Sequence, residues 1–172
     1  MNALPEQPPV QKTSTSTSKP RVLRAYEAAA KLPLGMHLFT TAVRTVAPYF
    51  LTVPAVTESL EAGQATVRMR PVPWTRNHLG TVHAIALCNL AEVSMGLVAE
   101  ATVPTTHTWI PKGMTVEYKA IARGTMRAVA TLALPKNLDI AQEIPVEITV
   151  RDSKDLIVFT AEIRIWVRPK KA

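Results

Sequence analysis

The feature that most limits how this chain can fold is the run TVHAIALCNLAEVSMGLVAEA at residues 81–101. Most of these residues are strong helix formers, and Thr81 is a suitable N-cap. Apolar side chains occur around the whole circumference of the predicted helix rather than along one stripe. We therefore expect a long helix that is buried and wrapped by a sheet.

The segments on either side of this helix supply the predicted sheet, because they show two-residue apolar spacing and end in turn-like separators. A helix is predicted over residues 21–41, bent near Pro33 and Gly35, with a second helical piece at 41–47. The predicted strands cover residues 53–60, 65–70, 108–122, 125–134, 144–152 and 156–168. This order is typical of an α+β fold in which a curved antiparallel sheet of about five or six strands surrounds one helix.

The length of 172 residues and the hydrophobic content of 47% fit one domain with one core. Residues 1–20 are rich in Pro, Ser and Thr, so we expect a flexible tail followed by a single domain over residues 21–172. The only cysteine, Cys88, gives neither a disulfide framework nor a metal site and is interpreted as a buried structural thiol. Without a signal sequence or a membrane-spanning run, the cytoplasm is the expected compartment.

The net charge of +7 favours an anionic partner. Nucleic acid is not favoured, because aromatic residues make up only 5% of the chain and there is no Gly-rich phosphate loop. A small polyanion such as the phosphate groups of coenzyme A fits this positive charge.

Glu92 is the unexpected residue of the predicted helix, because burying an unpaired carboxylate costs several kcal/mol or raises its pKa. His83 lies nine residues earlier, about 13 Å along the axis and half a turn away, so the two cannot share a site within one chain. A two-fold dimer with antiparallel helices would bring the start of one helix to the middle of the other. The free N–H groups at the helix start would then stabilise an oxyanion, and the carboxylate would attack a thioester carbonyl or activate water.

The run Asn77-x-x-Gly80-Thr81-x-His83-Ala84-Ile85, followed by Glu92, resembles the N-x-x-G-x-x-H-G-G…(D/E) pattern of hotdog-fold acyl-CoA thioesterases of the phenylacetyl-CoA and hydroxybenzoyl-CoA type. It is closer still to a poorly characterised branch of that superfamily. The resemblance covers residues 53–167. It implies a hydrolase acting on acyl-CoA or acyl-carrier thioesters, a homodimer or dimer of dimers, and no cofactor beyond the coenzyme A of the substrate.

The resemblance also implies roles for individual residues. Glu92 corresponds to the base or nucleophile, Asn77 positions the substrate carbonyl or the water, and His83 supports the helix start. The predicted substrate-binding residues are Ala84 as oxyanion donor, Ile85, Gly80, His78 and Lys112. The paired glycines of the pattern are replaced here by Ala84 and Ile85, which gives the acyl group or pantetheine a larger wall to pass.

Other interpretations remain open at this point. Asn77 is also a common turn residue, and His83 could serve only as a helix cap. His78 and Glu92 have a separation similar to that of hotdog dehydratases, although the Pro and second Gly of their motif are missing. The Ala84-Ile85 pair also fits a non-catalytic protein that binds acyl thioesters or fatty acids.

Overall fold

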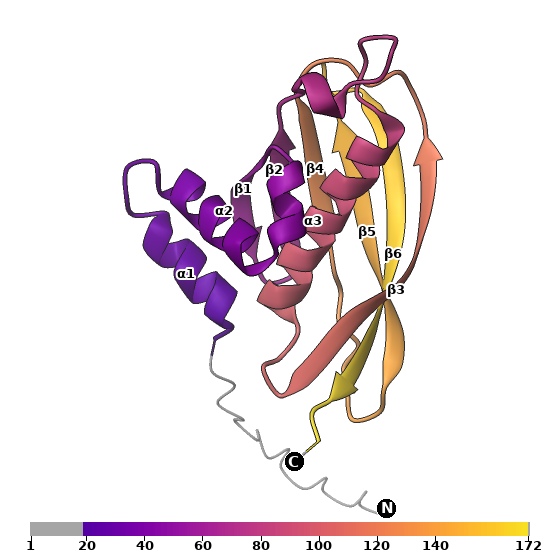
Figure 1. The fold of residues 1–172 in the computed structure, drawn as a ribbon. Helices are drawn as coiled ribbons and strands as arrows, with labels where there is room; N and C mark the ends of the chain where they lie inside the picture. Colours follow the sequence, from indigo (N-terminus) through magenta and orange to yellow (C-terminus); the bar gives the residue numbers. More distant parts are fainter. Residues whose placement is uncertain (1–18, 172) are drawn as a thin grey trace, which may run out of the picture.

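A computed structural model describes residues 19–171. One six-stranded antiparallel sheet, in the order β1-β2-β4-β5-β6-β3, curves around the long helix α3 (Figure 1). This is the hotdog arrangement, so the predicted α+β class and fold are confirmed. The flexible tail predicted for residues 1–20 falls outside the described residues except at its last two positions. The elements are α1 (Arg21–Ala29), α2 (Gly35–Val46), η1 (Pro48–Thr52), β1 (Ala55–Glu61), β2 (Gln64–Met69), η2 (Pro73–Thr75), α3 (Ala84–Thr102), β3 (His107–Tyr118), β4 (Met126–Thr131), β5 (Gln142–Arg151) and β6 (Ile157–Pro169).

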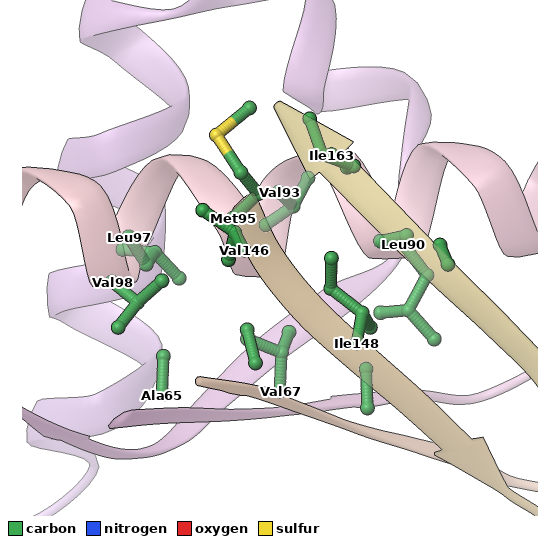
Figure 2. Close-up of a cluster of buried hydrophobic side chains, with 14 of the residues drawn as sticks. Ala65, Val67, Leu90, Val93, Met95, Leu97, Val98, Val146, Ile148 and Ile163 are labelled. Carbon is green, nitrogen blue, oxygen red and sulfur yellow. The ribbon is translucent and has the colours of Figure 1, made fainter. Parts of the chain in front are cut away.

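The core lies between α3 and the concave face of the sheet (Figure 2). Alternate strand residues point toward the helix, as the two-residue spacing predicts. Val67, Val146 and Ile163 from three strands are fully buried there, as are Leu90 and Val98 of α3. Burial of each such side chain stabilises the fold by about 1.5–3 kcal/mol relative to exposure.

The helix α3 differs from its prediction in two respects. It begins at Ala84 with His83 as N-cap, rather than after Thr81, because the Thr81 hydroxyl is hydrogen-bonded to Asn77 in the preceding loop. It is also not enclosed on every side. Half-buried or exposed residues recur along it at spacings of one to four residues and leave one stripe uncovered. This stripe consists of Ile85, Cys88, Asn89, Glu92 and Gly96.

The N-terminal helical extension is confirmed, and its bend has a local cause. The first helix ends at Ala29, and Leu34, the residue before α2, takes a left-handed backbone conformation with φ of 58°. Gly35 then packs directly against the Ala29 carbonyl, where any Cβ atom would collide with that oxygen. The chain therefore turns here, and α2 folds back against α1 through an edge-to-face contact of Tyr26 and Phe39 with ring centroids 5.4 Å apart.

These two helices cover the outer edge of β1. The Thr57 N–H donates to Thr40 Oγ1 at 3.1 Å, and the Tyr26 hydroxyl donates to the Glu58 carbonyl at 3.2 Å. The Arg44 guanidinium donates to the carbonyls of Val53 and Ala55 at 2.7 and 2.8 Å. Side chains of α1 and α2 thus replace the neighbouring strand that β1 lacks on this edge.

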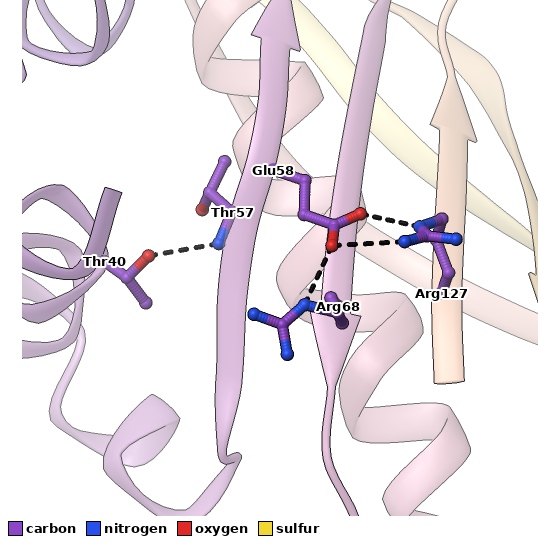
Figure 3. A network of polar contacts seen from close by, with 5 residues as sticks. All are labelled: Thr40, Thr57, Glu58, Arg68 and Arg127. Carbon is purple, nitrogen blue, oxygen red and sulfur yellow. Dashed lines mark hydrogen bonds and ion pairs between the residues drawn. The ribbon is translucent and has the colours of Figure 1, made fainter. Parts of the chain in front are cut away.

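A charge network links β1, β2 and β4 on the outer face of the sheet (Figure 3). Arg68 of β2 lies directly opposite Arg127 of β4, an arrangement that is repulsive by itself. Glu58 accepts from Arg68 at 2.8 Å and from Arg127 at 2.6 Å. The hydrogen bond from Arg127 is the main cause that lowers the pKa of the Glu58 carboxyl. Glu58 therefore ties three strands together.

The opposite edge of the sheet is formed by β3, a strand of twelve residues. It pairs with β6 from His107 to Tyr118, with a bulge between Pro111 and Gly113. Within residues 19–171, no strand pairs with its other side, and no side chain is hydrogen-bonded to its backbone there. A long open edge of this kind is a template for pairing with another chain.

Candidate functional site

The loop before α3 is organised by Asn77. Its side-chain oxygen accepts from the N–H groups of Leu79 and Thr81 at 3.0 and 3.1 Å, and its amide donates to Thr81 Oγ1 at 2.8 Å. Gly80 closes the turn at a positive φ of 72°, and its N–H donates to the Asn77 carbonyl. Asn77 and Gly80 therefore fix the path of the chain into the helix.

The start of α3 leaves one backbone donor available. His83 Nδ1 accepts from the Ile85 N–H at 3.1 Å, and the His83 carbonyl accepts from the N–H groups of Ala86 and Leu87. Within residues 19–171, the Ala84 N–H has no acceptor. At a helix N-terminus, an N–H of this kind is oriented toward any carbonyl oxygen placed on the axis.

His83 accepts this hydrogen bond through its unprotonated Nδ1, so Nε2 carries the proton when the ring is neutral. Both His83 and the neighbouring Ile85 side chain are exposed, and Ile85 retains 56% of its accessible surface. The Ala84 N–H is thus bordered by an imidazole on one side and an apolar side chain on the other.

Glu92 lies in the middle of the uncovered stripe of α3. No hydrogen bond or ion pair to its carboxyl group exists in the part of the chain that the structure describes. Burial raises the pKa of this carboxyl group, because desolvation disfavours the charged form. A half-buried carboxyl group without a partner is suited to proton transfer.

The face of β3 that looks toward α3 continues this surface. Its Trp109 donates to Glu100 at 3.1 Å, and its Tyr118 hydroxyl lies 3.4 Å from the Cys88 sulfur. That hydrogen bond raises the pKa of Tyr118. Met114, between them on the same face, is 37% exposed. An apolar strip of β3 therefore borders the stripe that carries Glu92.

The predicted site residues do not all come together in one subunit. Asn77, Gly80, His83, Ala84 and Ile85 lie together at the start of α3, as the motif predicts. Eight residues of helix separate Ala84 from Glu92, about 12 Å along the axis. The loop residue His78 is exposed.

Lys112 lies away from this group. Its Nζ is 5.8 Å from the ring centroid of Trp166. Trp166 neighbours the inward-facing Ile165 and Val167 on β6, so its own side chain lies on the outer face of the sheet. Within one subunit, Lys112 and Glu92 are therefore on opposite faces.

Two residues bordering the stripe were not among the predicted site residues. Tyr118 contacts Cys88, and the Tyr49 hydroxyl of η1 donates to Asn89 Oδ1 at 3.2 Å. The two-residue spacing of β3 places Tyr118 on the same face as Val116, which was a usable signal. The position of Tyr49 depends on how the N-terminal helices fold back, which no local pattern encodes. Cys88, interpreted as buried, is half-buried on the stripe.

A comparison with protein families matches residues 35–167 to a domain of unknown function named DUF4442. The chain belongs to this family. The match begins at α2, so the family includes the helix that covers the β1 edge. No curated protein sequence matches the chain.

Solved structures confirm the fold. A structural-genomics protein is 34% identical, with a TM-score of 0.74 over 87% of this chain and 99% of its own. A Pseudomonas aeruginosa protein of unknown function, described as a probable thioesterase, is 23% identical with a TM-score of 0.70 over 81% and 97%. A thioesterase from Haemophilus influenzae is 15% identical with a TM-score of 0.62 over 70% and 82%. The DUF4442 chain therefore has the fold of these thioesterases.

Helix α3 is also long and apolar enough to span a membrane by length and composition. It packs instead as the central helix of the sheet, with most of its side chains buried. Among residues 19–171, no group of three or more His, Cys, Asp or Glu side chains is placed to hold a metal ion.

Proposed function

We propose that this DUF4442 protein is a thioester hydrolase that acts on acyl-CoA thioesters at a site shared by two subunits. The observation that carries the proposal is Glu92, a half-buried carboxyl group on the uncovered stripe of α3 that has no partner among residues 19–171. The names of the related structures support the same class of reaction.

The open edge of β3 supports the dimer. Antiparallel pairing of two β3 edges would continue the sheet from one subunit into the next and satisfy the edge N–H and C=O groups. The two copies of α3 would then lie side by side and antiparallel. The exposed apolar side chains of Ile85, Met114 and Tyr118 would be covered in the same step.

The position of the two-fold axis follows from the residues that must meet. If Ala84 of one helix lies beside Glu92 of the other, the helices cross at the midpoint of these numbers, residue 88. Each functional residue is then about 6 Å along its helix from the crossing point. Neighbouring helices are about 8–10 Å apart, which leaves room for a thioester between the Ala84 N–H and the Glu92 carboxylate.

In this arrangement each residue has a separate role in the reaction. The Ala84 N–H donates to the thioester oxygen and stabilises the negative charge that develops on it. Glu92 of the other subunit either removes a proton from the attacking water and passes it to the leaving sulfur, or attacks the carbonyl carbon itself and forms an anhydride that water then hydrolyses. In both cases the C–S bond breaks, and the carboxylic acid and the coenzyme A thiol are released. His83 keeps the helix start in place, and Asn77 keeps the preceding loop in place. No cofactor beyond coenzyme A is required, and we expect the reaction in the cytoplasm.

The test is release of free thiol from a panel of short, medium, long and aromatic acyl-CoA thioesters. Glu92→Gln should reduce the rate at least about 100-fold, because it removes the base or nucleophile and keeps the size of the side chain. Glu100→Gln is the matched control, since Glu100 is an exposed residue two turns further along the same helix. Hydrolysis unchanged in Glu92→Gln would refute the proposed role. Binding of acyl-CoA without thiol release by any protein would instead indicate a binding function.

A further inference from the structure

A narrow apolar crevice lies between the N-terminal extension and α3. Its apolar lining comes from α2, η1, the start of the sheet and α3, and it measures about 10 Å³. That volume holds about one water molecule and no more. The main apolar side chains are Val43, Phe50, Val53, Val93 and Leu97.

The crevice lies next to the proposed catalytic group. Val93, which lines it, follows Glu92 directly in α3. On the other wall, Phe50 follows Tyr49, whose hydroxyl donates to Asn89 Oδ1 at 3.2 Å. Asn89 lies one helical turn before Val93. Because consecutive helix residues point about 100° apart, the crevice lies within one turn of Glu92 and beside the stripe rather than on it.

The lining of the crevice is effectively apolar. Two of its three polar members are engaged elsewhere, because Arg44 donates to two backbone carbonyls and Thr40 accepts from the Thr57 N–H; the third is the small side chain of Thr57. No buried side-chain nitrogen or oxygen within residues 19–171 is left without a partner. The crevice thus suits an alkyl chain and disfavours a charged group.

The wall formed by η1 is the least tightly packed side of the crevice. None of its five residues is fully buried, and its side-chain hydrogen bond to α3 is the single neutral one from Tyr49. The walls from α3 and from the strands of the sheet are made of buried residues, and the α2 wall is held to the β1 edge by the hydrogen bonds of Arg44 and Thr40. Moving Phe50 outward opens the crevice without disturbing the sheet.

We propose that this crevice receives the distal end of an unbranched aliphatic acyl chain, and that Phe50 limits the chain length. The inference rests on the proposed function, since it assumes that the thioester is bound at Glu92. It names the substrate class as aliphatic acyl thioesters rather than those with a charged acyl group. Phe50 is a specificity-determining residue in this proposal and does not take part in the bond-breaking step.

The test measures binding rather than turnover, with S-alkyl-CoA thioethers that carry butyl, octyl and dodecyl chains and cannot be hydrolysed. Each methylene that enters the crevice should tighten Kd about fourfold. In the natural protein this gain should stop at a short chain. In Phe50→Ala it should continue for about three more methylene groups, the space of the missing ring, and tighten Kd for the longer thioethers about 60-fold.

Leu51→Ala is the matched control, because Leu51 is the next residue of η1, is 61% exposed and does not line the crevice. Its chain-length dependence should equal that of the natural protein. Val43→Phe fills the crevice from the opposite wall, so it should weaken binding of the octyl and dodecyl thioethers and leave the butyl one unchanged.

Two results would overturn the inference. One is the same chain-length dependence in Phe50→Ala and the natural protein, and the other is a Kd that does not depend on chain length in any variant. Loss of the proposed function is a separate result, because it appears as absent thiol release from acyl-CoA and leaves the thioether binding series intact.

Discussion

The two edges of the sheet are finished in opposite ways. At β1, side chains of α1 and α2 supply the hydrogen-bond partners that a neighbouring strand would give, through Tyr26, Thr40 and Arg44. At β3, no helix of the described residues 19–171 lies over the edge, and the strand is longer by five residues, twelve against seven. One edge is closed by the chain itself, and the other is the edge at which we propose that a second chain pairs.

The open edge at β3 also has a distinct distribution of polar and apolar side chains. The charged residues Glu117 and Lys119 stand near the end of β3, where they form an ion pair with each other. The face of β3 toward α3 carries Trp109, Met114 and Tyr118 instead. Because the same open side exposes the stripe with Glu92, the edge left open is the one that would complete the proposed site.

The strongest way to break this comparison is to place a charge on the open side. Met114→Arg puts a guanidinium on the apolar face of β3 that would be covered in the dimer, where an unpaired charge costs several kcal/mol. We expect the dimer to dissociate and thioester hydrolysis to fall at least about 100-fold. Sedimentation equilibrium and thiol release measure the two effects.

Thr115→Arg is the control for this change, because it places the same charge on the same strand but on the outer face of the sheet. It should remain dimeric. A bismaleimide of short span provides a second readout, since Cys88 is the only cysteine and the proposed helix crossing places both copies near the axis. Cross-linking of the natural protein should disappear in Met114→Arg. A monomeric natural protein with full activity would contradict the shared site.

A smaller effect is expected at the closed edge. Thr40→Val keeps the shape of the side chain but removes the oxygen that accepts from the buried Thr57 N–H. Leaving a buried donor unsatisfied costs about 1–3 kcal/mol. We expect this loss in the free energy of urea-induced unfolding, with the dimer unchanged.

Thr41→Val is the matched substitution, because Thr41 is the next residue of α2, is exposed and bonds only to the His37 carbonyl of its own helix. Its cost should stay below about 0.5 kcal/mol. Equal losses in the two variants would mean that the hydrogen bond to the β1 edge adds nothing to stability, and that packing of α2 alone closes this edge.

Much of the fold was predictable, because periodicity is a local signal. The strands were located within a few residues, and the bend at Pro33 and Gly35 was predicted where α1 and α2 separate. The N-cap was misplaced by two residues because Thr81 and His83 are both able to cap. Only the tertiary bond from Asn77 to Thr81 decides between them.

The residues of the candidate site were predictable from the sequence, but the exposed face of α3 on which they lie was not. The motif located the helix start and the unusual carboxyl group of Glu92. The uncovered stripe was not foreseen, since residues such as Cys88 and Gly96 have the composition of a core. Whether a face is covered depends on strands and helices distant in sequence, and here β3 and η1 stop short of it. The face on which Lys112 lies depends on a bulge in β3, which periodicity does not reveal.

The smallest expected effect concerns the cost of keeping Glu92 on the open side. Its pKa in the folded protein is raised by burial, so the folded state binds the proton more tightly than the unfolded state does. Stability is then greatest below the ordinary pKa of a glutamate and falls as pH rises through the raised value. At neutral pH the charged carboxylate of Glu92 lowers the stability of the fold, and Glu92→Gln removes this cost.

We expect Glu92→Gln to have a higher Tm than the natural protein at pH 7 to 8, with the difference vanishing near pH 4, when both are measured at one protein concentration. Glu100→Gln, on the exposed end of the helix, is the control variant for this measurement. A natural protein that is more stable than Glu92→Gln at pH 8 would mean that a cation from the second subunit pairs with Glu92, in which case the open side is completed electrostatically as well as by strand pairing.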